Sequence, residues 1–175
     1  MNNLRLINET VITSNVSVID ITNVFNSDFD VYYVTVSDES DGTSGNNLSG
    51  RFIDEYGRVI ASSVYKYAMN IGKSETSFQE LASTSADKML VQFGTGNDSA
   101  IGGTGAYNYI YNPFNGNRYT HVYGTHPAMS GSNGRIYNKI ASLVLSNVIT
   151  GFRIIGDDGD ITNCTVTTYG VRADT

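Results

Sequence analysis

The chain has 175 residues, with 18 Gly, 2 Pro and 1 Cys, a length that fits one domain able to bury its own core. Lys and Arg number 11 against 17 Asp and Glu, and the net charge of −6 argues against binding to nucleic acid or to an anionic membrane. A single cysteine excludes an intrachain disulfide and a zinc site built of several cysteines.

Residues 1–17 are predicted to be an N-terminal docking arm, and residues 18–175 a single β-sandwich domain. The arm has only loose apolar patterning, at positions such as Leu4, Leu6 and Ile7, and it precedes the stretch of regular alternation. No apolar run has the length of a signal-peptide core or of a membrane span, so neither is expected.

Beyond the arm, the chain has the pattern of β-strands. The 12 Tyr and 7 Phe accompany many Val, Ile and Thr, the types that suit a pleated, half-buried surface. In residues 31–37 strict alternation puts Tyr32, Val34 and Val36 on one side and Val31, Tyr33 and Thr35 on the other. Further strands are predicted at 16–22, 48–54, 59–69, 88–93, 106–112, 117–123, 140–145, 151–155 and 161–172.

Turn residues separate these strands. Asn115-Gly116 predicts a hairpin between residues 107–111 and 118–123, and Asp158-Gly159 predicts a C-terminal hairpin joining 152–155 to 161–169. Residues 77–82 could form one helical turn, and residues 94–105 read as a long loop. The expected fold is all-β, an antiparallel sandwich or jelly roll of about eight to ten strands.

No catalytic motif supports an enzyme. His121 is expected in a strand and His126, before Pro127, in a loop, and both are interpreted as surface or packing histidines. The paired carboxylates at Asp54-Glu55, which a glycosidase would need, are expected to be solvated turn residues. Cys164 is interpreted as a small buried residue.

The acidic stretch 157–160 is oxygen-rich and could hold calcium. Thr168 stands where an EF-hand loop starting at Asp157 would need its closing Glu, and turn formation explains the acidic residues without a metal. We expect neither a metal nor a cofactor.

Tyrosines gather in the predicted 107–123 hairpin. Tyr107, Tyr109 and Tyr111 share one face of a strand, and Tyr119 and Tyr123 lie on its partner, beside Arg118. Three interpretations stay open: a ladder of cross-strand pairs that stabilises the sheet, an interface with another subunit or partner, or a glycan-binding site. The candidate binding residues are Tyr107, Tyr109, Tyr111, Arg118 and Tyr119.

Three segments resemble a group of virion structural proteins of tailed phages. Residues 18–34 resemble the group's opening "I-D-I-x-N-V-F … F-D-x-Y-x-V" run, and Tyr111-Asn112-Pro113-Phe114 resembles its "hydrophobic-x-N-P" turn. Residues 151–172 resemble its "G-F-x-I … G-x-I-x-V-Y-G-I-x" close. The chain departs from this close at Asn163-Cys164, where Gly is usual, and at Thr168, where Val is usual.

The resemblance implies a non-enzymatic β-sandwich or jelly-roll protein, often a homotrimer, on the capsid as a decoration or head-fibre protein or on the tail. The implied location is the virion, assembled in the host cytoplasm, with the other virion proteins as partners. The alternative is a receptor-binding, lectin-like tail module that binds a host surface glycan. A third hypothesis is an enzyme that depolymerises such a glycan.

Overall fold

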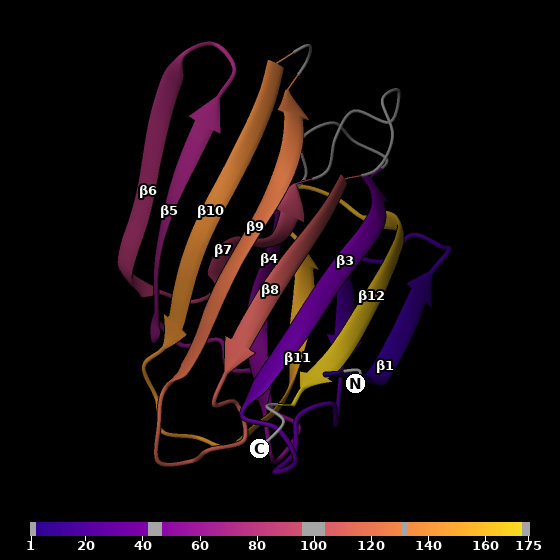
Figure 1. The fold of residues 1–175 in the computed structure, drawn as a ribbon, viewed down its shortest axis with the longest axis vertical. Coiled ribbons are helices and arrows are strands. Elements are labelled where there is room, and N and C mark those ends of the chain that lie inside the picture. The colour runs from indigo at the N-terminus through magenta and orange to yellow at the C-terminus, as the bar shows by residue number, and fades with distance from the viewer. Residues whose placement is uncertain (1–2, 42–46, 96–103, 131–132, 173–175) are drawn as a thin grey trace.

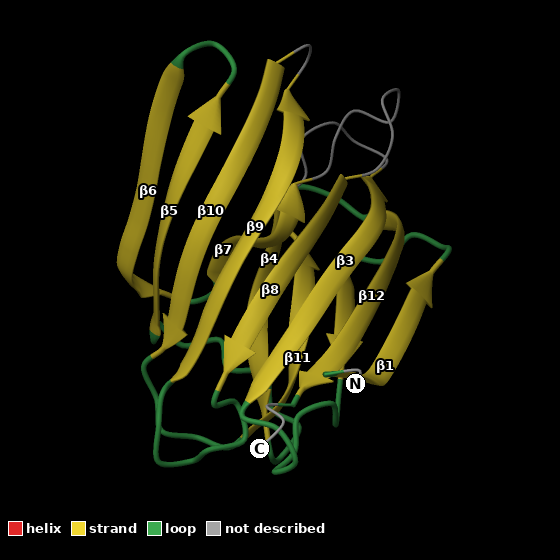
Figure 2. Cartoon of the chain, in the orientation of Figure 1, coloured by secondary structure: helices red, strands yellow, loops and turns green. Residues whose placement is uncertain are grey.

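The computed structural model describes residues 3–41, 47–95, 104–130 and 133–172. Within these residues the chain forms strands and no helix (Figure 2), so no helix there is long and apolar enough to cross a membrane. The predicted all-β class is confirmed. The strands are β1 (Leu4–Ile12), β2 (Val18–Ile21), β3 (Val31–Asp41), β4 (Asn47–Asp54), β5 (Tyr65–Lys73), β6 (Ser77–Ala86), β7 (Met89–Thr95), β8 (Thr104–Tyr111), β9 (Thr120–Ser130), β10 (Asn133–Leu143), β11 (Ile149–Gly156) and β12 (Ile161–Val171).

The strands form two antiparallel sheets that pack as a sandwich. The larger sheet has eight strands in the order β1-β12-β3-β8-β9-β10-β5-β6, and the smaller has four in the order β2-β11-β4-β7. In Figure 1 the larger sheet fans across the view and the smaller sheet lies behind part of it. The edge strand β6 is exposed along most of its length, so the smaller sheet does not cover the whole of the larger one.

The core lies between the sheets and is rich in aromatic rings. Phe93 and Phe152, both fully buried, stack with ring centroids 5.2 Å apart. Phe25 lies 5.9 Å from Phe152 and 4.7 Å from Tyr32, so one aromatic chain joins the two sheets. Such pairs add about 0.5–1.5 kcal/mol each beyond their buried area.

Two buried tyrosines fasten loops to this core through their hydroxyl groups. Tyr65 donates to the carbonyl of Ile60 and accepts from the amide of Phe52, each at 2.9 Å. The Tyr32 hydroxyl donates to the backbone carbonyl of Asn26 at 2.9 Å and accepts from the backbone amide of Asn26 at 2.8 Å. The segment before β3 is therefore held to the sheet by a buried side chain.

The predicted hairpin around Asn115-Gly116 is confirmed in its pairing. β8 and β9 are antiparallel neighbours, with Tyr109 opposite Tyr123, and residues 112–119 connect them. The connection is longer than a two-residue turn and contains Asn112 at a φ of 55°, a left-handed conformation that asparagine tolerates.

The predicted C-terminal hairpin is wrong. β11 pairs with β2 and β4 in the smaller sheet, whereas β12 pairs with β1 and β3 in the larger sheet. The Asp158-Gly159 turn connects a strand of the smaller sheet to a strand of the larger one. The prediction failed because a turn signal indicates that the chain reverses, but not which strand the next one pairs with.

The helical turn expected at residues 77–82 is also wrong, since these residues form the first part of β6. β6 pairs with β5 from Ser77 opposite Lys73 to Ala86 opposite Tyr65, so cross-strand pairing outweighs a weak helical pattern. Most of the loop expected at 94–105 lies outside the described residues.

The first seventeen residues were predicted to form an arm ahead of the sandwich. Leu4–Ile12 forms β1, which pairs along its length with β12 at the edge of the larger sheet. The sheet therefore begins at Leu4, and the docking role of this segment stays a prediction.

We predict that Gly151→Ala weakens the contact between β11 and β2. A methyl group at Gly151 would lie 2.2 Å from the backbone oxygen of Ile21, so β2 would have to move. Overpacking of this kind costs about 1–3 kcal/mol, which urea denaturation would measure as a lower free energy of unfolding.

Gly134→Ala is the matched control, because the nearest atom to its new methyl group is the Met129 sulfur at 4.0 Å. Equal stability of the Gly151 variant and the control would contradict the close approach of β2 and β11.

Candidate functional site

The outer face of the larger sheet is the first candidate surface. Along β3 the buried residues are Tyr32, Val34 and Val36, so Tyr33 and Thr35 point away from the core. The predicted division of this strand into two faces is confirmed.

One row of side chains crosses this outer face from edge to edge. Register pairs link each residue to the next in the neighbouring strand, and none of the eight is charged. The row contains four consecutive tyrosines with an aliphatic residue at either side. Its members, from β6 to β1, are Ala82, Ala68, Ile140, Tyr123, Tyr109, Tyr33, Tyr169 and Leu6; we call it the tyrosine row.

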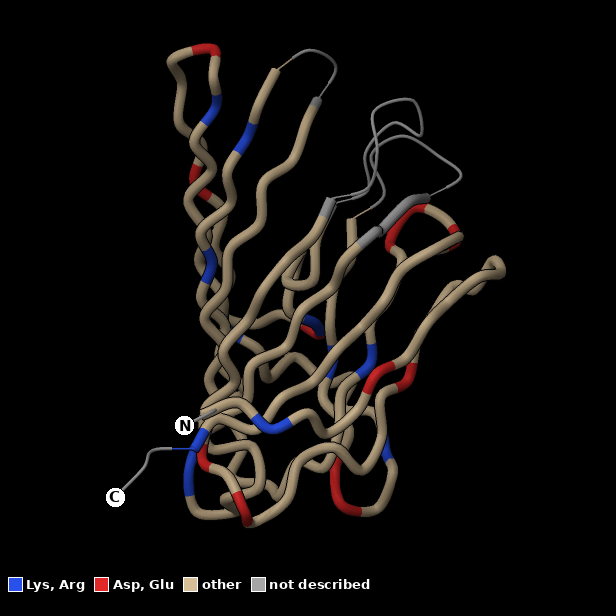
Figure 3. The backbone as a smooth tube through the Cα atoms, turned by 45° about the vertical axis from the view of Figure 1, so that its right-hand side comes forward, with Lys and Arg blue, Asp and Glu red and all other residues tan. Residues whose placement is uncertain are grey.

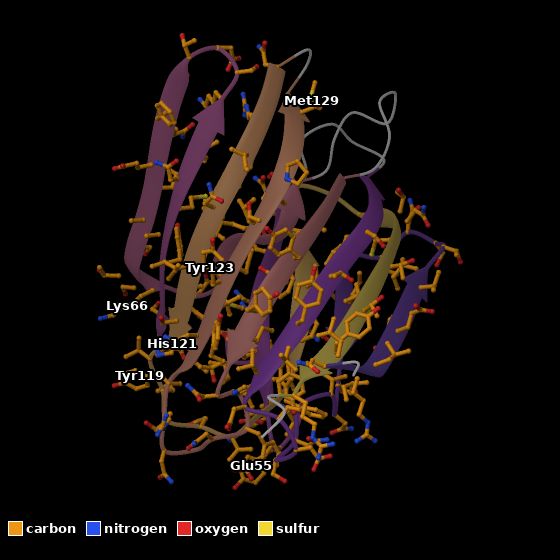
Figure 4. The ribbon with its side chains drawn as sticks, viewed as in Figure 1. Glu55, Lys66, Tyr119, His121, Tyr123 and Met129 are labelled. Atoms are coloured by element: carbon orange, nitrogen blue, oxygen red, sulfur yellow. The ribbon has the colours of Figure 1, made fainter. Side chains whose placement is uncertain are left out.

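The tyrosine row is exposed at several points. Tyr123 is 46% exposed, Ile140 55% and Leu6 56%, and Figure 4 shows Tyr123 in the middle of the sheet. Tyr33 has ring centroids 5.0 Å from Tyr109 and 6.2 Å from Tyr169. Partial burial, together with these neighbouring phenols, raises the pKa of Tyr33, so the hydroxyl stays neutral at ordinary pH.

Charges near the tyrosine row lie at the edges of the sheet. The rows of outward-facing residues on either side of the tyrosine row contain three charged residues. These are Glu80 on β6, Glu9 on β1 and Lys66 on β5. Strands β8, β9 and β12 contain no Asp, Glu, Lys or Arg. Of the other inner strands, β3 has its acidic residues only after Ser37, and β10 has Arg135 near its start and Lys139 buried in the core. In Figure 3, where Lys and Arg are blue and Asp and Glu are red, long stretches of the strands are accordingly tan. The face thus has an uncharged centre and a charged rim.

The five predicted binding residues fall into two groups. Tyr107, Tyr109 and Tyr111 share the outer face of β8, as predicted, opposite Thr125, Tyr123 and His121. Arg118 and Tyr119 lie in the connection between β8 and β9 and line a hollow at the loop end of the sandwich. The predicted residues therefore divide between the outer face of β8 and the loop end of the sandwich. These two regions adjoin at His121, which is opposite Tyr111 and lines the hollow.

Two adjoining hollows lie at this end. The Tyr119 hollow, of about 490 Å³, is lined by Asn112, Asn117, Arg118, Tyr119, His121 and Ser146. The Phe114 hollow, of about 300 Å³, shares Asn112 and Asn117 with it. Its other lining residues are Asn26, Ser27, Phe29, Asp30, Phe114, Asn115 and Gly116. Sequence reasoning missed these asparagines, because only the fold brings the segment before β3 beside residues 112–117.

The two histidines have different environments. His121 is exposed in β9, as predicted, and its Nδ1 lies 2.8 Å from the Ser142 hydroxyl. Among the described residues no carboxylate orients this pair, so the arrangement lacks the third member of a catalytic triad. Figure 4 shows His121 beside Tyr119 toward the lower end of the sheet.

The prediction that His126 lies in a loop is wrong, because it is a fully buried residue of β9. The sequence pointed to a loop because Pro127 follows His126, and proline has no backbone N–H to donate to a neighbouring strand. In the described pairing β9 has β8 beside it only from His121 to Thr125, so Pro127 sits where β9 has a single described neighbour. The interpretation of His126 as a packing residue is supported by its ring, which stacks on Tyr137 at 4.3 Å.

A buried lysine joins the two sheets beside His126. The Lys139 amine, 2% exposed, lies 2.5 Å from the carbonyl oxygen of Val91 and 2.7 Å from that of Gln92 on β7. It also lies 2.8 Å from His126 Nδ1. Burial lowers the pKa of Lys139 well below its ordinary value, and burial together with the Lys139 charge lowers the pKa of His126 to about 2.

The polar core continues next to this lysine. Gln92 donates through Nε2 to Asn108 Oδ1 at 2.7 Å, which ties β7 to β8. The Asn108 side chain lies over Gly124, where a methyl group would be 2.0 Å from Asn108 Oδ1. Because these groups are enclosed by the core, we interpret them as a structural link between the sheets and not as a reaction centre.

The acidic residues singled out from the sequence are engaged in structure. Asp157 accepts from Ser49 at 2.6 Å and pairs with Lys88 at 2.7 Å. Asp54 is buried, which opposes its ionisation, but hydrogen bonds from Arg58 and Tyr56 outweigh burial and lower its pKa, the opposite of what a general acid needs. In the described part of the chain no group of three metal-ligating side chains comes together.

Comparison with known proteins leaves the geometry as the main guide to function. No protein-family model matches the chain, and no curated protein matches its sequence.

We predict that the stability of the fold falls as pH is lowered from about 6.5 toward 2, in part because of His126. The unfolded chain binds a proton there near the ordinary pKa of 6.5, whereas the folded chain does so only near pH 2. This histidine therefore contributes stability that is full above pH 6.5 and decreases by about 1.4 kcal/mol per pH unit below it. Urea denaturation at several pH values would measure this slope.

His126→Asn, which keeps an acceptor for Lys139, should flatten the slope by about one proton equivalent. His121→Asn is the matched control and should keep the wild-type slope. An unchanged slope in the His126 variant would contradict a neutral, buried imidazole.

Proposed function

We propose that the chain is a non-enzymatic structural protein that assembles as an oligomer, a homotrimer on the resemblance stated above, in the virion of a tailed phage. The single observation that carries the assembly role is the tyrosine row, an uncharged aromatic and aliphatic strip across all eight strands of the larger sheet. The phage setting is supported by the sequence resemblance at residues 18–34, 111–114 and 151–172.

The composition of this face agrees with that of a protein interface. Interface centres are depleted in charge and enriched in tyrosine, and their rims are polar. The tyrosine row has these properties, with Glu9, Glu80 and Lys66 toward the edge strands. Exposed apolar patches of such continuity usually mark interaction sites on soluble proteins.

The edges of the sheet favour the same role. β1 and β6 end the larger sheet, so each has one side without a described strand neighbour. β6 has ten residues, one charge and no proline, features that leave an edge open to pairing or to coverage by another subunit. A closed oligomer would cover such edges.

We expect the wild-type chain to sediment at three times the 19.0 kDa mass of one chain, and Ile140→Glu to sediment as a monomer. A carboxylate at this position would be buried without a partner in the assembled face, which costs about 3–5 kcal/mol and weakens association at least 100-fold. Analytical ultracentrifugation would measure both masses.

Tyr56→Glu is the control, because Tyr56 is 72% exposed in the connection after β4 and lies outside the tyrosine row. Circular dichroism would show that both variants stay folded. A wild-type chain that remains monomeric at micromolar concentration, or an Ile140 variant that remains an oligomer, would overturn assembly through this face.

Immunogold electron microscopy tests the virion setting. Antibody raised to the recombinant chain should label intact particles of the source phage, over the head for a decoration or head-fibre protein and at the tail for a tail component. Particles that stay unlabelled, with the epitopes shown to be accessible, would contradict the virion role.

A second candidate function is a receptor-binding, lectin-like module. The observation that favours it is the Tyr119 hollow, where an aromatic ring, a guanidinium and two amides meet at the loop end of the sandwich. Loops held on a rigid scaffold are common positions for binding sites.

A further inference from the structure

The two hollows at the loop end of the sandwich adjoin each other, because Asn112 and Asn117 line both. Their volumes, about 490 and 300 Å³, suit small-molecule ligands, whose pockets measure about 300–1,000 Å³. We call the two together the asparagine groove.

Backbone hydrogen bonds hold the walls of the asparagine groove in place. The amide of Asn112 donates to the carbonyl of Asp30 at 2.8 Å, and the amide of Ile149 donates to the carbonyl of Pro113 at 2.8 Å. Asn112 keeps a left-handed backbone, and Asn115 Oδ1 accepts from the amide of Asn117 at 3.1 Å. The groove is therefore formed before a ligand arrives, which lowers the entropic cost of binding.

Several polar groups in the groove are free to meet a ligand. Within the described residues, the side chains of Asn112, Asn117 and Arg118 make no hydrogen bond or ion pair to the protein. Each amide can both donate and accept, as can each hydroxyl group of a sugar. Asn26 and Asn115, in contrast, use their side-chain oxygens to shape the walls.

Aromatic rings complete the match to a sugar. Tyr119 is 45% exposed in one hollow and Phe114 is 37% exposed in the other. Each offers an apolar surface for the C–H face of a pyranose ring, with polar groups beside it. One ring in each hollow favours a ligand of more than one sugar unit.

The charge balance favours a neutral ligand. Arg118 in the Tyr119 hollow is offset by Asp30 in the adjoining Phe114 hollow, and the whole chain has a net charge of −6. Tight binding of a polyanion needs several cations, whereas amides and hydroxyls suit a neutral polyol.

We propose that the asparagine groove binds a neutral oligosaccharide, with Asn112, Asn117 and Arg118 hydrogen-bonding its hydroxyl groups and Tyr119 and Phe114 stacking on its rings. The inference rests on the second candidate function and is independent of assembly through the tyrosine row. It moves the sugar site away from Tyr107 and Tyr109, which line neither hollow.

The test uses linear oligosaccharides of glucose, galactose, mannose and N-acetylglucosamine, together with sialylated and sulfated counterparts, in saturation-transfer NMR and calorimetry with the full chain. We expect binding of a neutral member, and affinity lower by about tenfold in Tyr119→Ala and in Asn117→Ala, since each loses a ring contact or hydrogen bonds. Both residues are exposed, so neither change should unfold the chain. Tyr56→Ala, outside both the groove and the tyrosine row, should bind like the wild type. Tyr109→Ala tests the sheet face as the alternative sugar site.

The contrary results separate the two levels of the proposal. Failure of every panel member to bind would overturn both the groove and the lectin-like function, and would leave the assembly role untouched. Binding that is lost in Tyr109→Ala but kept in Tyr119→Ala would overturn the groove while supporting a receptor role for the sheet face. Binding of sulfated or sialylated members alone would overturn the assignment of a neutral ligand.

Discussion

The pleat of the larger sheet is the constraint on which the rest of the molecule depends. In a strand, neighbouring side chains point to opposite faces, so every strand that buries a row of residues must present another row outward. The eight strands of the larger sheet bury Tyr32, Val34 and Ile110 between the layers. They therefore present Tyr33, Tyr109 and their neighbours on the far face, which no layer of the described residues covers.

The contact between the layers is partly polar, which is unusual for a sandwich core. The Lys139 amine reaches from β10 to two carbonyl oxygens of β7, and Gln92 reaches from β7 to Asn108 of β8. The Lys139 amine and the Gln92 amide have defined partners, so they fix how β7 lies on the larger sheet more strictly than apolar contacts would. Val91, at a φ of 52°, shows that the backbone of β7 departs from regular strand geometry where it meets the lysine, a costly conformation for a β-branched residue.

The two proposed surfaces obey different physical requirements. The tyrosine row lies on regular strands, whose register makes it continuous, and an uncharged aromatic face suits another protein surface. The asparagine groove lies where chain segments 26–30 and 112–119 meet at one end of the sandwich. Irregular backbone there, such as Asn112, gives concave shape and free polar groups, which suit a small polar ligand.

By itself the sequence determined the fold class, the inward and outward sides of β3, the pairing of β8 with β9 and the common face of Tyr107, Tyr109 and Tyr111. Each follows from local alternation or from a turn between adjacent strands, and both are properties of neighbours in the chain. The tertiary structure decided which strand pairs with which when the partners are distant. It put β11 and β12 in different sheets, made residues 77–82 a strand and placed His126 in the core against Lys139. It also brought Asn26 and Asp30 beside Asn117 and aligned Tyr33, Tyr109 and Tyr123 into one row, because register between strands is set by long-range hydrogen bonding and burial.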